Sequence, residues 1–339
     1  MFSACAPAAT PAPTTVPPTA LPPTTAPTVA PTVVSPIPPP TDATTPITAK
    51  VLAEWHVSMP ETMAFGFDSV WVPSHRDPNV MTRIDPVTNQ TIATIDGIGY
   101  QAHQAIVAGD SVWVTGYGLK KIDPKSNAIT SSIQDTEHYS YVAYGFGSLW
   151  ATNESDRLDR IDPGTSKIIA SIELGDGYVD YINVVFATDS AIWVDHIDEA
   201  ELIRIDPATN SIVSKTPDEE LVNEAKSTTS IPKGNGSDFI WKVVSPGGLL
   251  RIDPNKGAGI TFLAMSPEQI VGTWFLAVTD KSIWVGGHGQ FERVDVATNQ
   301  IEATYKTQIR GDGFIAIGFG SVWLAYEGAN LFQRLDIAP

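Results

Sequence analysis

The sequence predicts an all-β fold, a seven-bladed β-propeller built from four-stranded antiparallel blades, and three observations carry this prediction. A tryptophan motif recurs seven times, and each copy is followed by a triplet of a basic residue, an aliphatic residue and Asp. Most triplets lead into a turn and a β-branched run. The tryptophan segment is apolar on both faces, as in Val70-Trp71-Val72, which requires a sheet that is covered on both sides.

The tryptophans recur every 37 to 48 residues, a spacing typical of propeller blades. They are Trp71, Trp113, Trp150, Trp193, Trp241, Trp284 and Trp323. The triplets that follow them are Arg83-Ile84-Asp85, Lys121-Ile122-Asp123, Arg160-Ile161-Asp162, Arg204-Ile205-Asp206, Arg251-Ile252-Asp253, Arg293-Val294-Asp295 and Arg334-Leu335-Asp336. We interpret both features as structural, because a large ring suits packing between blades and an Asp carboxylate can begin a tight turn.

Each repeat is predicted to form four short strands, and the second repeat shows the pattern. Short runs rich in Val, Ile, Thr and aromatic residues favour strands, and Gly, Pro and Asn mark the turns between them. The four runs are 104–108, 112–115, 119–122 and 129–133.

The seventh repeat has three such strands before Pro339, and the missing fourth strand is predicted at the other end of the chain. Apolar side chains occupy alternate positions within residues 47–57, with Val51, Ala53 and Trp55 on one side of the predicted strand. Pairing this segment with 331–335 would close the ring and remove its open edges. The alternative, a β-solenoid, would need no complementary ends.

Residues 1–46 are predicted to be a disordered spacer rich in Pro, Thr and Ala, and 47–339 the propeller. The spacer holds 14 of the 27 prolines, and Asp42 is its one charged side chain. Such runs favour extended polyproline II conformation. The segment Phe2-Ser3-Ala4-Cys5 resembles the end of a bacterial lipoprotein signal, which implies lipidation of Cys5; the alternative is a free cysteine in a disordered tail.

The formal net charge of −17 argues against a nucleic-acid partner, because phosphate backbones bind basic surfaces. No apolar run of about 20 residues occurs, so membrane contact is expected only through a lipid anchor at Cys5. Motifs for a serine hydrolase, a nucleotide-binding loop or a zinc protease are missing, and we expect no cofactor.

The longest insertion, between the fourth and fifth repeats, predicts a short helix over residues 217–226. Thr216 would be its N-cap, Pro217 its first residue and Glu219 part of a capping box. We consider two interpretations of this helix: it covers the mouth of the channel as a lid, or it lies on the surface without a role in binding.

Deviations from the repeat mark the candidate ligand surface, because blade packing does not require them. They fall in the loops that connect the fourth strand of one blade to the first of the next, and the second strand to the third, which meet on one face. The candidate ligand-binding residues are Tyr100, His103, His138, Tyr139, Tyr178, Tyr181, Trp274, His288 and Tyr326. Alternatively, these rings cap the blade tops and pack on one another.

One acidic cluster offers metal ligands, Asp195, His196 and Asp198. Carboxylates with one imidazole suit Mg²⁺, Ca²⁺ or Mn²⁺. The competing interpretation is a solvated charged loop, and on that basis no metal site is predicted.

The pattern over 69–95, with Ser-Val-Trp-Val followed by Arg-Ile-Asp-Pro and Thr-Asn, resembles the YVTN repeat of YncE-like bacterial and archaeal propellers. The resemblance covers 47–339 and implies the fold rather than one function. A related family, the virginiamycin B lyases, uses a His at the start of a first strand as base and glutamates after a second strand to hold Mg²⁺. His103 matches that His position, whereas no second strand here is followed by Trp-Phe-Thr-Glu.

Three functions follow as hypotheses. The first is a non-enzymatic, extracytoplasmic propeller, tethered to the cell envelope by a lipid, that binds a small molecule, glycan or protein as a monomer or as a subunit of a complex. The second is a lyase resembling the streptogramin lyases, with His103 as its base and a divalent metal. The third is a scaffold subunit of a cell-envelope complex.

Overall fold

The computed structural model describes residues 32–33, 45–175, 177, 183–197, 199–217, 240–244, 248–253, 259–264, 275–287, 289–298, 300–309 and 313–336. All of them belong to one compact unit, Pro31–Pro339. The regular secondary structure in these ranges is entirely β-strand. Within them, no helix is long and apolar enough to cross a membrane.

Three antiparallel sheets have the expected four-stranded order. The first contains β4 (Ala64–Gly66), β5 (Ser69–Pro73), β6 (Val80–Asp85) and β7 (Gln90–Asp96). The second contains β15 (Val184–Ala187), β16 (Ile192–His196), β17 (Glu201–Asp206) and β18 (Ser211–Pro217). The third contains β26 (Gly313–Gly318), β27 (Ser321–Tyr326), β28 (Leu331–Asp336) and β3 (Lys50–His56).

A seven-stranded sheet covers the second and third repeats. Its long strand β11 pairs with β10 through its first half and with β12 through its second half. The strands are β8 (Ala105–Ala108), β9 (Ser111–Val114), β10 (Gly116–Asp123), β11 (Ala128–Gly145), β12 (Ser148–Asn153), β13 (Arg157–Asp162) and β14 (Lys167–Glu173). The four strands predicted for the second repeat are confirmed, but no Gly or Pro interrupts 134–144, so the chain stays extended where a loop was expected.

Two further sheets carry short parallel strands from the N-terminal region at their edges. One contains β19 (Ile240–Val244), β20 (Gly248–Asp253), β21 (Gly259–Ala264) and β1 (Thr32–Val33). The other contains β22 (Phe275–Val278), β23 (Ser282–Gly287), β24 (Gln290–Asp295), β25 (Ile301–Lys306) and β2 (Ile47–Thr48). Strand β1 lies inside the segment predicted to be a disordered spacer, and its backbone pairs with Gly259 and Ile260.

The predicted pairing between the two ends of the propeller is confirmed. Strand β3 runs antiparallel to β28, from His56 opposite Leu331 to Lys50 opposite Asp336. By contrast, the helix predicted to begin at Pro217 does not start there, because Thr216 and Pro217 continue β18 and pair with Leu202 and Glu201. The rest of that predicted helix, 218–226, lies outside the described residues, as does Cys5.

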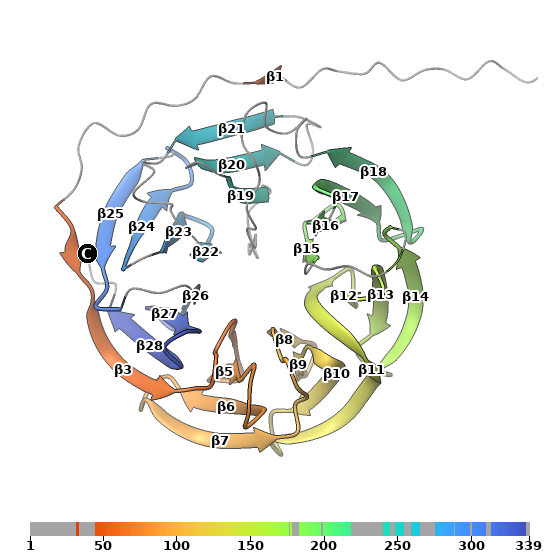
Figure 1. Ribbon diagram of the computed structural model, residues 1–339, viewed down its shortest axis with the longest axis horizontal. Helices are drawn as coiled ribbons and strands as arrows, with labels where there is room; N and C mark the ends of the chain where they lie inside the picture. The colour runs from red at the N-terminus through yellow and green to blue at the C-terminus, as the bar shows by residue number, and fades with distance from the viewer. Residues whose placement is uncertain are drawn as a thin grey trace, which may run out of the picture. The chain divides into compact units, whose positions relative to one another are not determined.

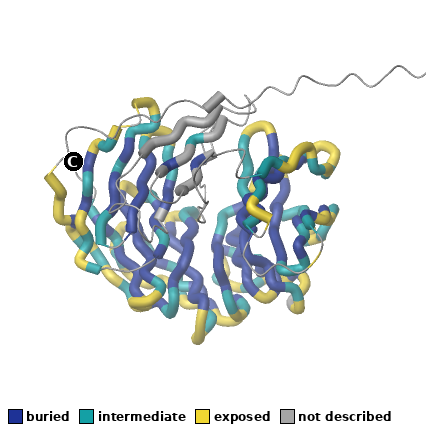
Figure 2. The backbone as a smooth tube through the Cα atoms, turned by 45° about the horizontal axis from the view of Figure 1, so that its top comes forward, coloured by how far each residue is buried: buried dark blue, intermediate teal, exposed yellow. Residues whose placement is uncertain are grey.

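The sheets of this unit are arranged around a common centre (Figure 1). Strands β8, β15, β22 and β26 lie nearest the centre, and β7, β14, β18 and β25 lie outermost. Figure 2 shows that buried residues run along the inner strands while exposed residues gather at the turns.

The hydrophobic core is divided among the contacts between successive sheets. All seven motif tryptophans lie on strands and are buried. Each buried cluster joins one sheet or repeat to the next; for example, Trp113 packs with Leu149 and Ile161, and Trp323 with Val70 and Ile84. Burial on both faces of the tryptophan strand is therefore explained by the neighbouring sheets, as the sequence predicted.

The basic residue of the triplet links neighbouring blades. Arg83 lies over the ring of Trp71, 4.5 Å from its centroid, and donates hydrogen bonds to Pro124 O and Asn127 Oδ1 in the next repeat. Arg160 makes the equivalent contacts with Pro207 and Asn210. The triplet Asp begins a turn, since its carboxylate accepts N–H bonds from the residues two and three positions further on in several repeats.

Candidate functional site

Three loops of the first two repeats bring Glu61, His75 and His103 together. Glu61 lies just before β4, His75 just after β5, and His103 just before β8. The backbone N–H of His75 is held by Ser58 O and Met59 O. All three residues are buried, with 6–7% of their surface exposed. The two loop types that the sequence predicted to share one face therefore meet here.

A single carboxylate lies between the two imidazoles. His103 Nδ1 donates to Glu61 Oε2 at 2.7 Å. His75 Nδ1 lies 2.9 Å from Glu61 Oε1, so each oxygen of the carboxylate contacts one imidazole. The two imidazole rings are 4.6 Å apart and nearly perpendicular. Among the described residues, this is the one group of three side chains with ligand atoms close enough to share an ion, all within 4.8 Å of one another.

A row of rings leads from this buried cluster to the surface. His103 contacts His138 at 5.2 Å between centroids, and His138 contacts Tyr117 at 5.1 Å. Tyr117 in turn stacks with Tyr100 at 6.4 Å, and Arg76 donates to the Tyr100 hydroxyl. Both tyrosines are exposed, so the row has a solvent-facing aromatic end and a buried imidazole end.

Burial sets the charge states of this row. Burial alone raises the pKa of the Glu61 carboxyl, but hydrogen bonds from His103 and His75 outweigh burial and hold that pKa below its ordinary value. Burial, with the nearby His103, lowers the pKa of His138 to about 4. At neutral pH the site therefore holds one ionised carboxylate beside a neutral His138 ring.

Hydrogen bonds between blades fix the backbone around the cluster. Thr62 Oγ1 donates to His103 O at 3.0 Å, which ties the first repeat to the second. The amide of Val142 donates to Gln104 Oε1 at 2.7 Å, and Thr115 Oγ1 donates to Ser140 O at 2.9 Å, which tie the second repeat to the third. The site is thus built on a rigid support rather than on free loops.

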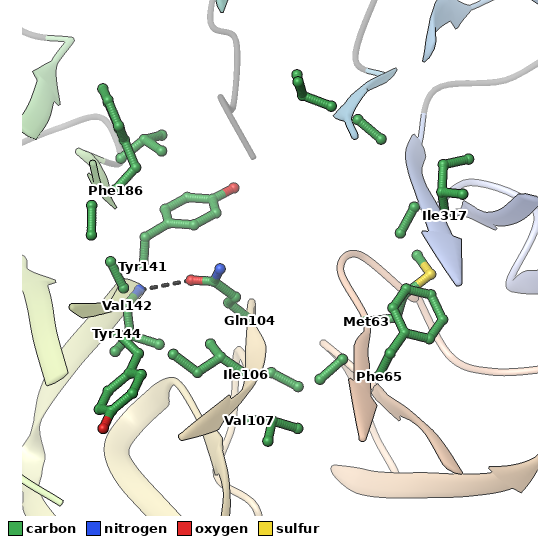
Figure 3. A pocket seen from close by; sticks show the side chains of 18 of the residues that line it. Met63, Phe65, Gln104, Ile106, Val107, Tyr141, Val142, Tyr144, Phe186 and Ile317 are labelled. Atoms are coloured by element: carbon green, nitrogen blue, oxygen red, sulfur yellow. Dashed lines mark hydrogen bonds between the residues drawn. The ribbon is translucent and has the colours of Figure 1, made fainter. Parts of the chain in front are cut away.

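A cavity of about 710 Å³ adjoins the cluster at the centre of the propeller. The inner strands β4, β8, β15, β22, β26 and the second half of β11 line it, mostly with apolar side chains. Thr279, Asp280 and Lys281, which follow β22, add polar and charged groups to the lining. Gln104 and Tyr141 are its polar groups next to His103, whose ring lies 6.4 Å from that of Tyr141. Figure 3 shows the Tyr141 ring and the Gln104 amide on the same side of the pocket.

The structure brings together three of the nine predicted ligand residues, Tyr100, His103 and His138. Tyr139 points away from them, because neighbouring residues of a strand face opposite sides; its hydroxyl donates to Asp159 Oδ2 inside the blade. Tyr326 is buried in the hydrophobic core, and burial raises its pKa to about 12. The remaining four, Tyr178, Tyr181, Trp274 and His288, lie outside the described residues.

The acidic cluster considered for a metal does not converge. Asp195 and His196 are successive residues of β16 and face opposite sides, and His196 Nε2 instead contacts Asp156 Oδ1 at 2.8 Å. Asp198 lies outside the described residues. Sequence reasoning missed Glu61, which stands in a single-copy segment, Pro60-Glu61-Thr62, that no repeat or motif marks.

These features define the chain as a β-propeller with a polar cluster beside its central cavity. No protein-family model matches the chain, and no curated protein sequence matches it. Among the solved structures that share its fold is a chain of Kuenenia stuttgartiensis hydrazine synthase, with a TM-score of 0.66 and 11% sequence identity. The alignment covers 85% of this chain and 98% of that chain. At this identity the similarity shows the fold alone.

Proposed function

We propose that this protein is a closed, seven-bladed β-propeller that binds an uncharged small ligand in its central cavity, outside the cytoplasm. The seven tryptophan strands support the number of blades. Two contacts support closure of the ring. Strand β3 pairs with β28, and Arg334 donates to Asn89 Oδ1, which joins the last repeat to the first.

The observation that carries the binding function is the cavity itself. At about 710 Å³ it has the size of small-molecule sites, and it combines apolar walls with a few polar groups. Its polar side beside His103 offers the Gln104 amide and the Tyr141 phenol, which burial keeps neutral by raising its pKa. Asp280 and Lys281 also line the cavity, and their opposite formal charges add no net charge to its wall. Such a lining, on a chain of net charge −17, favours an uncharged ligand over an anion.

A thermal-shift screen of neutral sugars, short peptides and planar heterocycles tests this proposal. A ligand of the cavity should raise the melting temperature of the intact protein, and its affinity should change little between low and high salt. Tyr141→Phe, which removes one hydroxyl, should weaken binding, whereas Val87→Ala on an exposed turn should not. If Tyr141→Phe leaves the affinity of a ligand unchanged and that affinity falls steeply with salt, the ligand binds outside this cavity.

The envelope location rests on the N-terminal segment. A Cys after small residues, followed by a long proline-rich spacer, suits a propeller held by a lipid at a distance from a membrane surface. Mass spectrometry of the N-terminal peptide, from protein isolated from the cells that make it, should find a diacylglyceryl group on Cys5. An unmodified Cys5 in that peptide would show that the protein is not anchored to a membrane through a lipid at Cys5.

A further inference from the structure

We propose that Glu61, His75 and His103 bind one divalent transition-metal ion of the class that prefers imidazole ligands, for which Zn²⁺ is the probe. The three side chains come from three loops that are far apart in sequence, and they aim Nδ1, Nδ1 and a carboxylate at one point. This inference is independent of the ligand proposed for the central cavity, because it concerns the metal alone.

The convergence of the three side chains is the first argument. Their ligand atoms lie within 4.8 Å of one another, and all three residues are buried. Each imidazole presents Nδ1 to a different oxygen of the Glu61 carboxylate, His75 to Oε1 at 2.9 Å and His103 to Oε2 at 2.7 Å. Ligand atoms that come from three separate loops and surround one point can share a single ion.

The second argument is the chemistry of the set. Two imidazoles and one carboxylate form a common three-residue set for Zn²⁺ and for other first-row transition ions, whereas Mg²⁺ prefers oxygen ligands. The Glu61 carboxylate supplies the negative charge that a buried cation needs. Metal binding needs the lone pair of His103 Nδ1, so the proton that this atom now donates to Glu61 moves to Nε2.

The third argument is the surrounding support. Metal ligands need neighbours that hold their orientation. The backbone of His103 is fixed by Thr62, and that of His75 by Ser58 and Met59. Three protein ligands leave a tetrahedral ion with one open position, as in zinc sites that bind a water or an exogenous donor.

A structural role for the same three residues makes a different prediction, and the response to Zn²⁺ separates the two roles. If the triad only stabilises the fold, His75→Gln should lower the melting temperature of the metal-free protein, because the buried His75 ring contacts Glu61 and His103, and Zn²⁺ should not stabilise the wild type. If the triad is a metal site, Zn²⁺ should raise the melting temperature of the wild type, and His75→Gln should remove most of that rise.

The experiment is calorimetric titration of the intact, chelator-treated protein with ZnCl₂ alone and with MgCl₂ alone. We expect one Zn²⁺ per chain, weaker Mg²⁺ binding, and a rise in melting temperature with Zn²⁺. His75→Gln and Glu61→Gln should each lower the Zn²⁺ affinity by at least about 100-fold, since loss of mere outer-shell partners costs about 10–100-fold. The matched control is His56→Gln, an exposed histidine of β3 that should leave Zn²⁺ affinity unchanged.

Three results would overturn the proposal. One is the absence of saturable Zn²⁺ binding by the folded wild-type protein. Another is Mg²⁺ affinity equal to or above that for Zn²⁺. The third is a Zn²⁺ affinity that His56→Gln lowers as much as His75→Gln does. If Glu61→Gln fails to fold, His75→Gln still decides the question, because it keeps the buried carboxylate and its hydrogen bond with His103.

Discussion

Trp71, Trp150 and Trp323 each donate an indole N–H to the carbonyl of a glycine five residues earlier, Gly66, Gly145 and Gly318. At these glycines a Cβ would lie only 2.6–2.7 Å from a side chain of the neighbouring blade. Glycine thus allows close approach of the blades while its carbonyl fixes the tryptophan. Sequence reasoning identified the tryptophans but not these glycines, because their requirement arises between repeats.

Trp113 has no exposed surface and packs between the second and third repeats. We expect Trp113→Ala to lower the free energy of unfolding by about 3–5 kcal/mol, since it removes a large buried ring and leaves a cavity. Denaturant unfolding followed by circular dichroism measures this loss. Val87→Ala, at a position that is 87% exposed, is the control and should change stability little. An unchanged midpoint for Trp113→Ala would show that this ring is not part of the packing layer.

His138 should make the fold sensitive to mild acid. Its pKa is about 4 in the folded protein and about 6.5 in the unfolded chain, so below pH 6.5 the unfolded chain takes up a proton that the folded protein does not. The free energy of unfolding therefore falls as pH decreases from 6.5 to about 4, and above 6.5 this loss is absent. Melting curves in chelator across this window should show a shallower pH dependence for His138→Gln. Parallel curves for variant and wild type would contradict the assignment.

At the scale of elements, β3 is predicted to hold the last blade. It supplies the outer strand of the sheet of β26–β28, and without it β28 would present an unpaired edge. A truncation beginning at Ser58 should aggregate or lose cooperative melting, as measured by calorimetry and light scattering. A truncation beginning at Thr45 keeps β3 and serves as the control. If both truncations melt like the intact chain, β3 does not close the structure.

Local periodicity explains which elements the sequence could predict. The Asp of the triplet and the Asn at the end of the turn act within a few residues; Asn89, Asn127 and Asn210 all have the left-handed backbone that the turn needs. The continuity of β11 was missed because a loop was assumed wherever repeats join. That assumption also placed Tyr139 beside His138 on the ligand face, although an extended chain turns neighbouring side chains to opposite sides.

At the scale of the whole molecule, the site depends on contacts that no single repeat contains. His75 and His103 are 28 positions apart, and Glu61 belongs to neither of their loops. Sequence analysis named His103 as a departure from the repeat and predicted the face on which it lies. Which of them meet, and around which carboxylate, follows only from how adjacent blades are set against each other.

The most direct test of this account is anomalous diffraction at the zinc absorption edge from crystals of the intact chain soaked in ZnCl₂. The account predicts one strong peak within bonding distance of His75 Nδ1, His103 Nδ1 and the Glu61 carboxylate, beside the central cavity. Zinc peaks confined to surface histidines such as His56, with Glu61 still hydrogen-bonded to His103, would contradict it.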